Sequence, residues 1–248
     1  MKVEPEWFNY NFPVVGLEIY RSGWRVCRTS RLKPKEIPRG LRREIMELTK
    51  ESLSRLAFII ANTNIQFQSI ITLTYGETFP RDGQKVKADL HRFLVKFGRA
   101  FGEHSYVWFV EFQRRGAPHF HILTSLPGPN RLELVKFAQI WVSACETCSR
   151  EEREKMFLVH SHRSAWERIR EQNGATRYAL KYCLKQRQKV VPKDYRNVGR
   201  FWGTSRDVKP DLIKRVTITD DELRIALDHL EHPIANWEIL PKLIFARD

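Results

Sequence analysis

Two apolar runs joined by a polar turn, residues 106–112 and 118–123, constrain the fold more than any other part of the chain. The aromatic and β-branched residues of both runs favour strands. Residues 113–117 between them are mostly polar and include Gly116, which is typical of a hairpin turn. The sequence therefore predicts a β-hairpin near the middle of the chain.

Three potential metal ligands lie in this hairpin. His119 and His121 are two residues apart, so in a strand both imidazoles project from one face. The turn would return the chain so that Glu111, on the first strand, faces the histidines. Two nitrogens and one carboxylate oxygen, with coordination positions left open, suit a borderline or hard divalent cation used in catalysis.

The charge of the chain indicates the class of its partner. Of 248 residues, 43 are Lys or Arg and 29 are Asp or Glu, which gives a net charge of +14. A basic excess attracts polyanions, and the usual polyanion is nucleic acid. A basic surface retained only for solubility is the alternative.

The distribution of the charge favours nucleic acid. Residues 21–43 contain nine Lys or Arg and one acid, and residues 181–215 contain eleven and three. Aromatic residues are interleaved in the second stretch: Tyr182, Tyr195, Phe201 and Trp202. This combination suits single strands, because bases stack on rings while phosphates contact cations. The alternative is that Phe201 and Trp202 belong to the core.

Cysteine usage and hydropathy indicate the compartment. The four cysteines form no convincing disulfide framework in a chain of this length. The first residues are acidic and contain proline, unlike a secretory signal, and no apolar run approaches the ~20 residues of a membrane span. We therefore expect a reducing cytoplasm and no membrane partner.

Hydrophobic periodicity predicts the other elements. Further strands are expected at residues 66–75, 157–160 and 213–218. Helices are expected from Pro38 to Asn62 and at residues 85–101, 132–148, 165–169, 175–188 and 220–230. This order predicts an α+β fold, with a central antiparallel sheet and helices packed on it.

The helix expected at residues 175–188 carries two tyrosines four residues apart. Tyr178 and Tyr182 therefore share one helix face, and Lys181 and Lys185 repeat the spacing beside them. A phenol with a pKa of about 10 is a poor nucleophile at neutral pH, and nearby cations or a metal-polarised phosphate would compensate. An amphipathic helix with half-buried aromatics is the alternative for this pattern alone.

A nucleophilic tyrosine, a divalent metal and phosphate-binding lysines together make a phosphodiester-transfer site. In-line attack by the tyrosine would give a phosphotyrosine link and a free hydroxyl. The link retains the bond energy, so the strand can be rejoined or passed on, which hydrolysis by water would prevent.

These residues resemble the HUH endonuclease superfamily, whose replication initiators nick DNA for rolling-circle replication. Residues 70–75 are similar to the first motif, residues 118–121 to the histidine-hydrophobic-histidine motif, and residues 178–185 to the tyrosine motif. The two-tyrosine form resembles that of small single-stranded DNA phages. Order and spacing agree over residues 66–205, including the segment at 199–203 that follows the tyrosine helix.

The resemblance implies an HUH, RRM-like or ferredoxin-like sandwich that cuts single-stranded DNA at an origin hairpin. The protein would be joined to the 5′ phosphate, and the 3′ hydroxyl would be left for a polymerase. Glu111 takes the position of the extra metal ligand, for manganese or magnesium, and Gln113, two residues later on the same face, is the competing candidate. Which tyrosine attacks first stays open.

The resemblance also implies DNA-binding residues and partners. Candidates for DNA contacts are Arg114, Arg115, Lys189, Arg200 and Trp202. No phosphate-binding loop of the Gly-x-x-x-x-Gly-Lys-Ser/Thr type occurs in the sequence, so a helicase as well as a polymerase would come from the host or the element. The origin sequence, the native metal, the type of element and the oligomeric state stay open.

We expect three regions along the chain. Residues 1–65 form a basic N-terminal extension with a helix, and residues 66–205 form the endonuclease domain. Residues 206–248 form a C-terminal strand and helix packed on that same domain.

Other interpretations use the same residues differently. A transposase or a plasmid-mobilising relaxase would share the chemistry, although a relaxase usually carries a third clustered histidine. A non-catalytic nucleic-acid-binding module would not need the histidines or tyrosines at all. His160 and His162 repeat the spacing of the first histidine pair, and Cys145 and Cys148 could be imagined as zinc ligands, but a metal site is the weaker interpretation of both groups.

Overall fold

The structure is a computed structural model that describes residues 15–28, 45, 47–146, 148–169, 190–219, 221 and 222. Contacts divide the chain into two compact units. One consists of residues 42–210, and the other of residues 1–41 with 211–248. The predicted regions 1–65, 66–205 and 206–248 divide the chain by function and stay a prediction.

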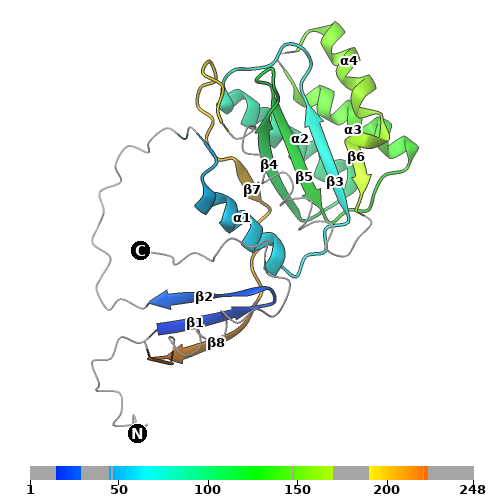
Figure 1. Ribbon diagram of the computed structural model, residues 1–248. Coiled ribbons are helices and arrows are strands. Elements are labelled where there is room, and N and C mark those ends of the chain that lie inside the picture. Colours follow the sequence, from blue (N-terminus) through cyan, green and yellow to red (C-terminus); the bar gives the residue numbers. More distant parts are fainter. Residues whose placement is uncertain are drawn as a thin grey trace, which may run out of the picture. The chain divides into compact units, whose positions relative to one another are not determined.

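The larger unit is built on a five-stranded antiparallel sheet (Figure 1). Its strands are β3 (Ser69–Thr74), β4 (Tyr106–Phe112), β5 (Pro118–Thr124), β6 (Trp166–Arg168) and β7 (Trp202–Thr204). They lie in the order β6-β3-β5-β4-β7, so β5 is central. The pairing of β4 with β5 confirms the hairpin that the sequence predicts.

Among the described residues, four α-helices accompany this sheet: α1 (Lys50–Asn62), α2 (Gly83–Phe101), α3 (Arg131–Ala144) and α4 (Arg150–His160). A short 3-10 helix, η2 (Arg163–Ala165), follows α4. Polar residues start the helices, because their side chains accept hydrogen bonds from backbone N–H groups that have no partner within the helix. Thr49, Asp82 and Ser149 have this role in α1, α2 and α4, and Asn130 forms a reciprocal capping box with Glu133 in α3.

The two faces of the sheet are covered differently (Figure 1). On one face, apolar strand residues such as Leu73 and Phe120 pack in one cluster with Phe93 of α2 and with Phe137 and Trp141 of α3. On the other face, a second cluster joins α1 to one end of β3, β4 and β5 through Leu56, Ile60, Ile70, Val107 and Leu123. The remainder of this second face carries polar side chains, because strand residues alternate between faces.

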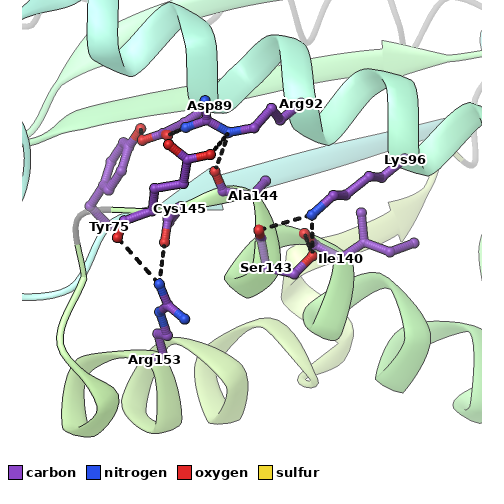
Figure 2. Close-up of polar contacts among 10 residues, drawn as sticks. Tyr75, Asp89, Arg92, Lys96, Ile140, Ser143, Ala144, Cys145 and Arg153 are labelled. Carbon is purple, nitrogen blue, oxygen red and sulfur yellow. Dashed lines mark hydrogen bonds and ion pairs between the residues drawn. The ribbon is translucent and has the colours of Figure 1, made fainter.

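Cationic side chains join the helices to one another at the C-terminal end of α3 (Figure 2). Arg92 of α2 donates to the carbonyl of Ala144 at 2.9 Å, and Lys96 donates to the carbonyl of Ser143 at 2.9 Å. Arg153 of α4 donates to the carbonyl of Cys145 at 3.2 Å. These carbonyls have no partner within α3, so the three cations satisfy them and hold the helices in place.

The smaller unit contains a three-stranded antiparallel sheet in the order β2-β1-β8. Its strands are β1 (Val15–Tyr20), β2 (Gly23–Arg28) and β8 (Leu212–Ile218). The buried carboxylate of Glu18 on β1 is paired with Arg25, at 3.1 Å, and with Arg215 from the two neighbouring strands. The predicted strand at residues 213–218 is therefore confirmed, and it pairs with the N-terminal strand β1.

The α+β fold with a central antiparallel sheet and extra terminal elements is confirmed. Two local predictions are wrong. Residues 157–160 belong to α4 rather than to a strand, because Met156 and His160 are buried four residues apart behind the Ser149 cap. Residues 166–168 form β6 rather than a helix, because they pair with the edge of β3. Both errors concern short segments whose state is decided by tertiary contacts.

Other predicted boundaries moved or were not tested. The helix expected from Pro38 begins at Lys50, behind its Thr49 cap, and the helix expected to reach residue 148 ends at Ala144. The helix predicted at residues 175–188 lies outside the described residues, as does most of the one predicted at 220–230.

Candidate functional site

The polar part of the second sheet face consists of two rows of side chains. One row crosses β3, β5 and β4 at Thr74, His119 and Glu111. The next row crosses at Thr72, His121 and Phe109. Residues directly opposite one another in adjacent strands project from the same face, so the register brings the three predicted metal ligands together.

His119 is held through its Nδ1 atom. The Oγ1 atom of Thr74 lies 2.6 Å from this nitrogen, and the Nε2 atom of Gln113 lies 3.3 Å from it. The side-chain oxygen of Gln113 accepts a hydrogen bond from Arg115 at 3.0 Å, which orients the amide nitrogen towards His119. The ring of His119 is half-buried, so its direction is set by neighbours on both adjacent strands.

His121 and Glu111 lie deeper than His119. Their exposed fractions are 2% and 5%, and His121 Nε2 is 3.4 Å from Glu111 Oε2. The ring of Phe109 stacks on that of His121 with a centroid separation of 5.1 Å, and Thr72 Oγ1 lies 3.5 Å from His121 Nδ1. A carboxylate buried at this depth needs a hydrogen bond or a cation close to it.

The donor set suits a divalent cation, although the side chains are not yet gathered round one. Within the described ranges, no group of three or more His, Cys, Asp or Glu side chains is arranged to hold a metal ion as it stands. The 3.4 Å between His121 and Glu111 is nevertheless the spacing of two ligands that share an ion, roughly 3 to 3.5 Å for bonds of about 2.1 Å. His119 is the third donor, with its ring centroid 4.7 Å from that of His121. Side-chain rotation would complete the set on a register that the backbone already supplies.

The two arginines of the hairpin turn differ. Arg114 is exposed, as a residue that contacts DNA should be. The guanidinium of Arg115 donates to backbone carbonyls just after β3, including that of Tyr75 at 2.7 Å, as well as to Gln113. Arg115 therefore ties the hairpin to the end of β3, and its predicted contact with DNA stays a prediction.

Two more of the proposed DNA-binding residues are described. Arg200 is exposed, whereas Trp202 is half-buried on β7 and its indole N–H donates to the Ser52 hydroxyl of α1 at 2.9 Å. Trp202 packs against both core clusters, as the core interpretation expects. Lys189 lies outside the described residues.

The predicted nucleophilic half of the site also lies outside the described residues. It comprises Tyr178, Lys181, Tyr182 and Lys185. Their roles stay predictions from the sequence.

The second histidine pair is separated by its local structure. His160 ends α4 with an exposed fraction of 1%, whereas His162 is exposed and caps η2. Burial lowers the pKa of His160 to about 4, against the opposing effect of the Met156 carbonyl. Among the described residues, Cys145 and Cys148 are buried free thiols within the core around Met156. Neither group resembles a metal site.

Sequence reasoning overlooked Thr72 and Thr74. Both lie within the segment that resembles the first motif, and both contact a histidine of the candidate site. Their alternation with Ile71 and Leu73 could have revealed them, because that pattern places the two hydroxyls on the face opposite the apolar core.

Comparison with known families supports a replication-initiator protein. The sequence profile of the family described as Replication-associated protein ORF2 matches residues 68–187, just under half of the chain. The match begins before β3, contains the hairpin and reaches past both tyrosines. No curated protein and no solved structure gives a significant match to the chain. The family match indicates a replication initiator of the Rep type, which acts on DNA.

The helices also bear on membrane association. Within the part of the chain that the structure describes, none is both long and apolar enough to span a bilayer.

Proposed function

We propose that the protein initiates rolling-circle replication by nicking and rejoining single-stranded DNA at an origin, through a 5′-phosphotyrosine intermediate. The observation that carries the proposal is the placement of Glu111, His119 and His121 on one sheet face by the register of β4 and β5. The family match over residues 68–187 supports the biological role.

In this proposal Glu111, His119 and His121 hold manganese or magnesium. A bound divalent ion would polarise the non-bridging oxygens of the scissile phosphate. The neighbouring residues keep the ligands in place: Thr74 holds His119, and Phe109 limits the rotation of His121. Gln113 assists by contacting His119 instead of replacing Glu111 as a ligand.

The covalent step belongs to Tyr178 or Tyr182. The phenolic oxygen attacks phosphorus in line, and the bond from phosphorus to the 3′ oxygen breaks. The departing 3′ oxygen takes up a proton, and the 5′ phosphate remains on the tyrosine. Lys181 and Lys185, on the same predicted helix, favour the phenolate and bind phosphate oxygens. Attack by a 3′ hydroxyl on this link reverses the step and rejoins a strand.

Basic residues near the candidate site are available to bind the strand. Arg114, in the turn beside Gln113, and Arg200, just before β7, both have exposed side chains. The net charge of +14 raises the local concentration of DNA. Binding is therefore expected to weaken steeply as salt is raised.

The test is the formation of a covalent protein-DNA adduct. Purified full-length protein is incubated with manganese and a 3′-labelled pool of single-stranded oligonucleotides of randomised sequence, then separated on a denaturing gel. We expect labelled DNA to migrate with the protein in the presence of manganese and not in the presence of a chelator. A protein that binds the pool but never forms an adduct would instead be a non-catalytic nucleic-acid-binding module.

Matched tyrosine variants identify the nucleophile. Tyr178→Phe and Tyr182→Phe each remove one phenolic oxygen and keep the ring. We expect at least one to reduce adduct formation strongly and the double variant to abolish it. An adduct that persists in the double variant would disprove the tyrosine assignment.

A further inference from the structure

We propose that His160, a residue of the helical layer, positions the candidate metal ligand His119 through Thr74. The inference rests on the proposed function only in treating His119 as a ligand. His160 touches neither DNA nor metal in this proposal, so it is a positioning residue.

Thr74 occupies a place in β3 beyond the reach of the edge strand on one side. Among the described strands, β6 pairs with β3 only at Ser69, Ile70 and Ile71. Beyond that point, the backbone N–H of Thr74 donates to His160 Nε2 at 3.0 Å, and the Thr74 carbonyl accepts from Trp141 Nε1 at 3.0 Å. Two side chains of the helical layer thus take the place of a neighbouring strand.

This arrangement determines how Thr74 meets His119. In an antiparallel pair, a residue whose N–H and C=O point away from the neighbouring strand forms a non-hydrogen-bonded pair with it, in which the side chains lie closer. Thr74 stands in such a pair with His119, and the 2.6 Å between Thr74 Oγ1 and His119 Nδ1 agrees with it. The hydrogen bonds from His160 and Trp141 therefore hold the backbone that carries the hydroxyl.

His160 is itself held in one orientation and one tautomer. Its Nε2 accepts from Thr74, so its proton lies on Nδ1, which donates to the Met156 carbonyl at 2.7 Å. The ring is 1% exposed and lies near the rings of Phe137 and Trp141. No rotation of this imidazole preserves both hydrogen bonds.

The helical layer makes a firm support for both residues. Trp141 lies on α3 just before the carbonyls that Arg92, Lys96 and Arg153 satisfy (Figure 2). The next residue of the β3 segment is anchored there too, because the Tyr75 hydroxyl donates to Asp89 of α2 at 2.8 Å. Thr74 is thus fixed from the face of the sheet opposite to the histidines.

The consequence for His119 is the choice of its tautomer. A metal can bind Nε2 only when that nitrogen lacks a proton, which requires the proton to be on Nδ1. Thr74 Oγ1 then accepts this proton in a hydrogen bond. Displacement of Thr74 would remove that acceptor and allow the other tautomer, whose Nε2 carries the proton.

The experiment compares His160→Phe, which loses the acceptor, with His160→Gln, whose side-chain oxygen can accept the Thr74 N–H. Full-length, metal-free proteins labelled with ¹⁵N-histidine report the tautomer of His119 by NMR, and calorimetry reports the affinity for Mn²⁺. We expect wild type and His160→Gln to hold the proton on Nδ1. His160→Phe should show a mixture of tautomers and bind Mn²⁺ about 10-fold more weakly.

A second pair of variants keeps the test decisive if His160→Phe does not fold. Thr74→Val removes the hydroxyl at nearly constant shape, and Thr74→Ser retains it. We expect Thr74→Val alone to change the His119 tautomer and weaken Mn²⁺ binding. A wild-type tautomer in both His160→Phe and Thr74→Val, or in Thr74→Val where His160→Phe does not fold, overturns the inference. Absence of Mn²⁺ binding in wild type would instead contradict the proposed function, and the tautomer would still test the positioning.

Discussion

The chain contains two His-x-His segments with the same spacing and opposite structures. In β5, the strand places His119 and His121 on one face, with ring centroids 4.7 Å apart. At the end of α4, the helix stops between His160 and His162, so one ring is buried in the helical layer and the other is exposed. Spacing alone therefore does not define a metal site, because its meaning depends on the backbone that carries it.

The two segments are nevertheless connected. His160 bonds the backbone of Thr74, and the Thr74 side chain contacts His119. One pair supplies candidate ligands, while a member of the other pair supports them from the opposite face of the sheet. Variants at each histidine should separate these roles.

The largest effect is expected for His119→Ala. Removal of a candidate ligand should reduce adduct formation by at least about 100-fold, because metal stabilisation of the transition state is worth several kcal/mol. Binding of single-stranded DNA, measured by fluorescence anisotropy at fixed salt, should change little. Cleavage at the wild-type rate would disprove the metal assignment.

A dependence of stability on pH is expected from His160. The pKa of this buried imidazole is about 4 in the folded protein, against about 6.5 in the unfolded chain. Between these values only the unfolded chain binds the proton, so stability is lost as the pH falls from 6.5 towards 4. The expected loss is about 3 kcal/mol, measured by urea unfolding. His160→Gln is the control, and an equal loss in that variant would show that another group is responsible.

A smaller effect is expected for Gln113→Ala. This variant removes the amide that contacts His119 and accepts from Arg115. We expect Mn²⁺ affinity to fall by about 10-fold or less, as for groups that orient a ligand without binding the metal. A loss as large as that of Glu111→Ala would instead make Gln113 a ligand.

The smallest effect is expected for His162→Ala. The ring is exposed, and its contacts are local hydrogen bonds to Ser164. Loss of this short cap should change the free energy of unfolding by about 0.5 kcal/mol and leave cleavage unchanged. A cleavage defect here would show that the second histidine pair also serves the site.

Much of the candidate site was predictable because it depends on local alternation. The hairpin and the shared face of His119 and His121 follow from period-two patterning and one turn. The strand expected at residues 157–160 failed because its apolar residues fit either a strand or a buried helix turn, and only packing against the core decides. The contact of Thr74 with His160 joins residues 86 positions apart, so no local pattern reveals it.

The sequence by itself determined the donor set, its common face and the basic character of the chain. Strand geometry is strongly periodic, so the side of the sheet on which a residue lies follows from its position in the run. Only the tertiary structure decided which histidine pair stays together, that Arg115 ties the turn to β3, and that His160 stands where β6 ends. These outcomes depend on which distant groups satisfy buried backbone donors and acceptors, and that is a property of the whole packed fold.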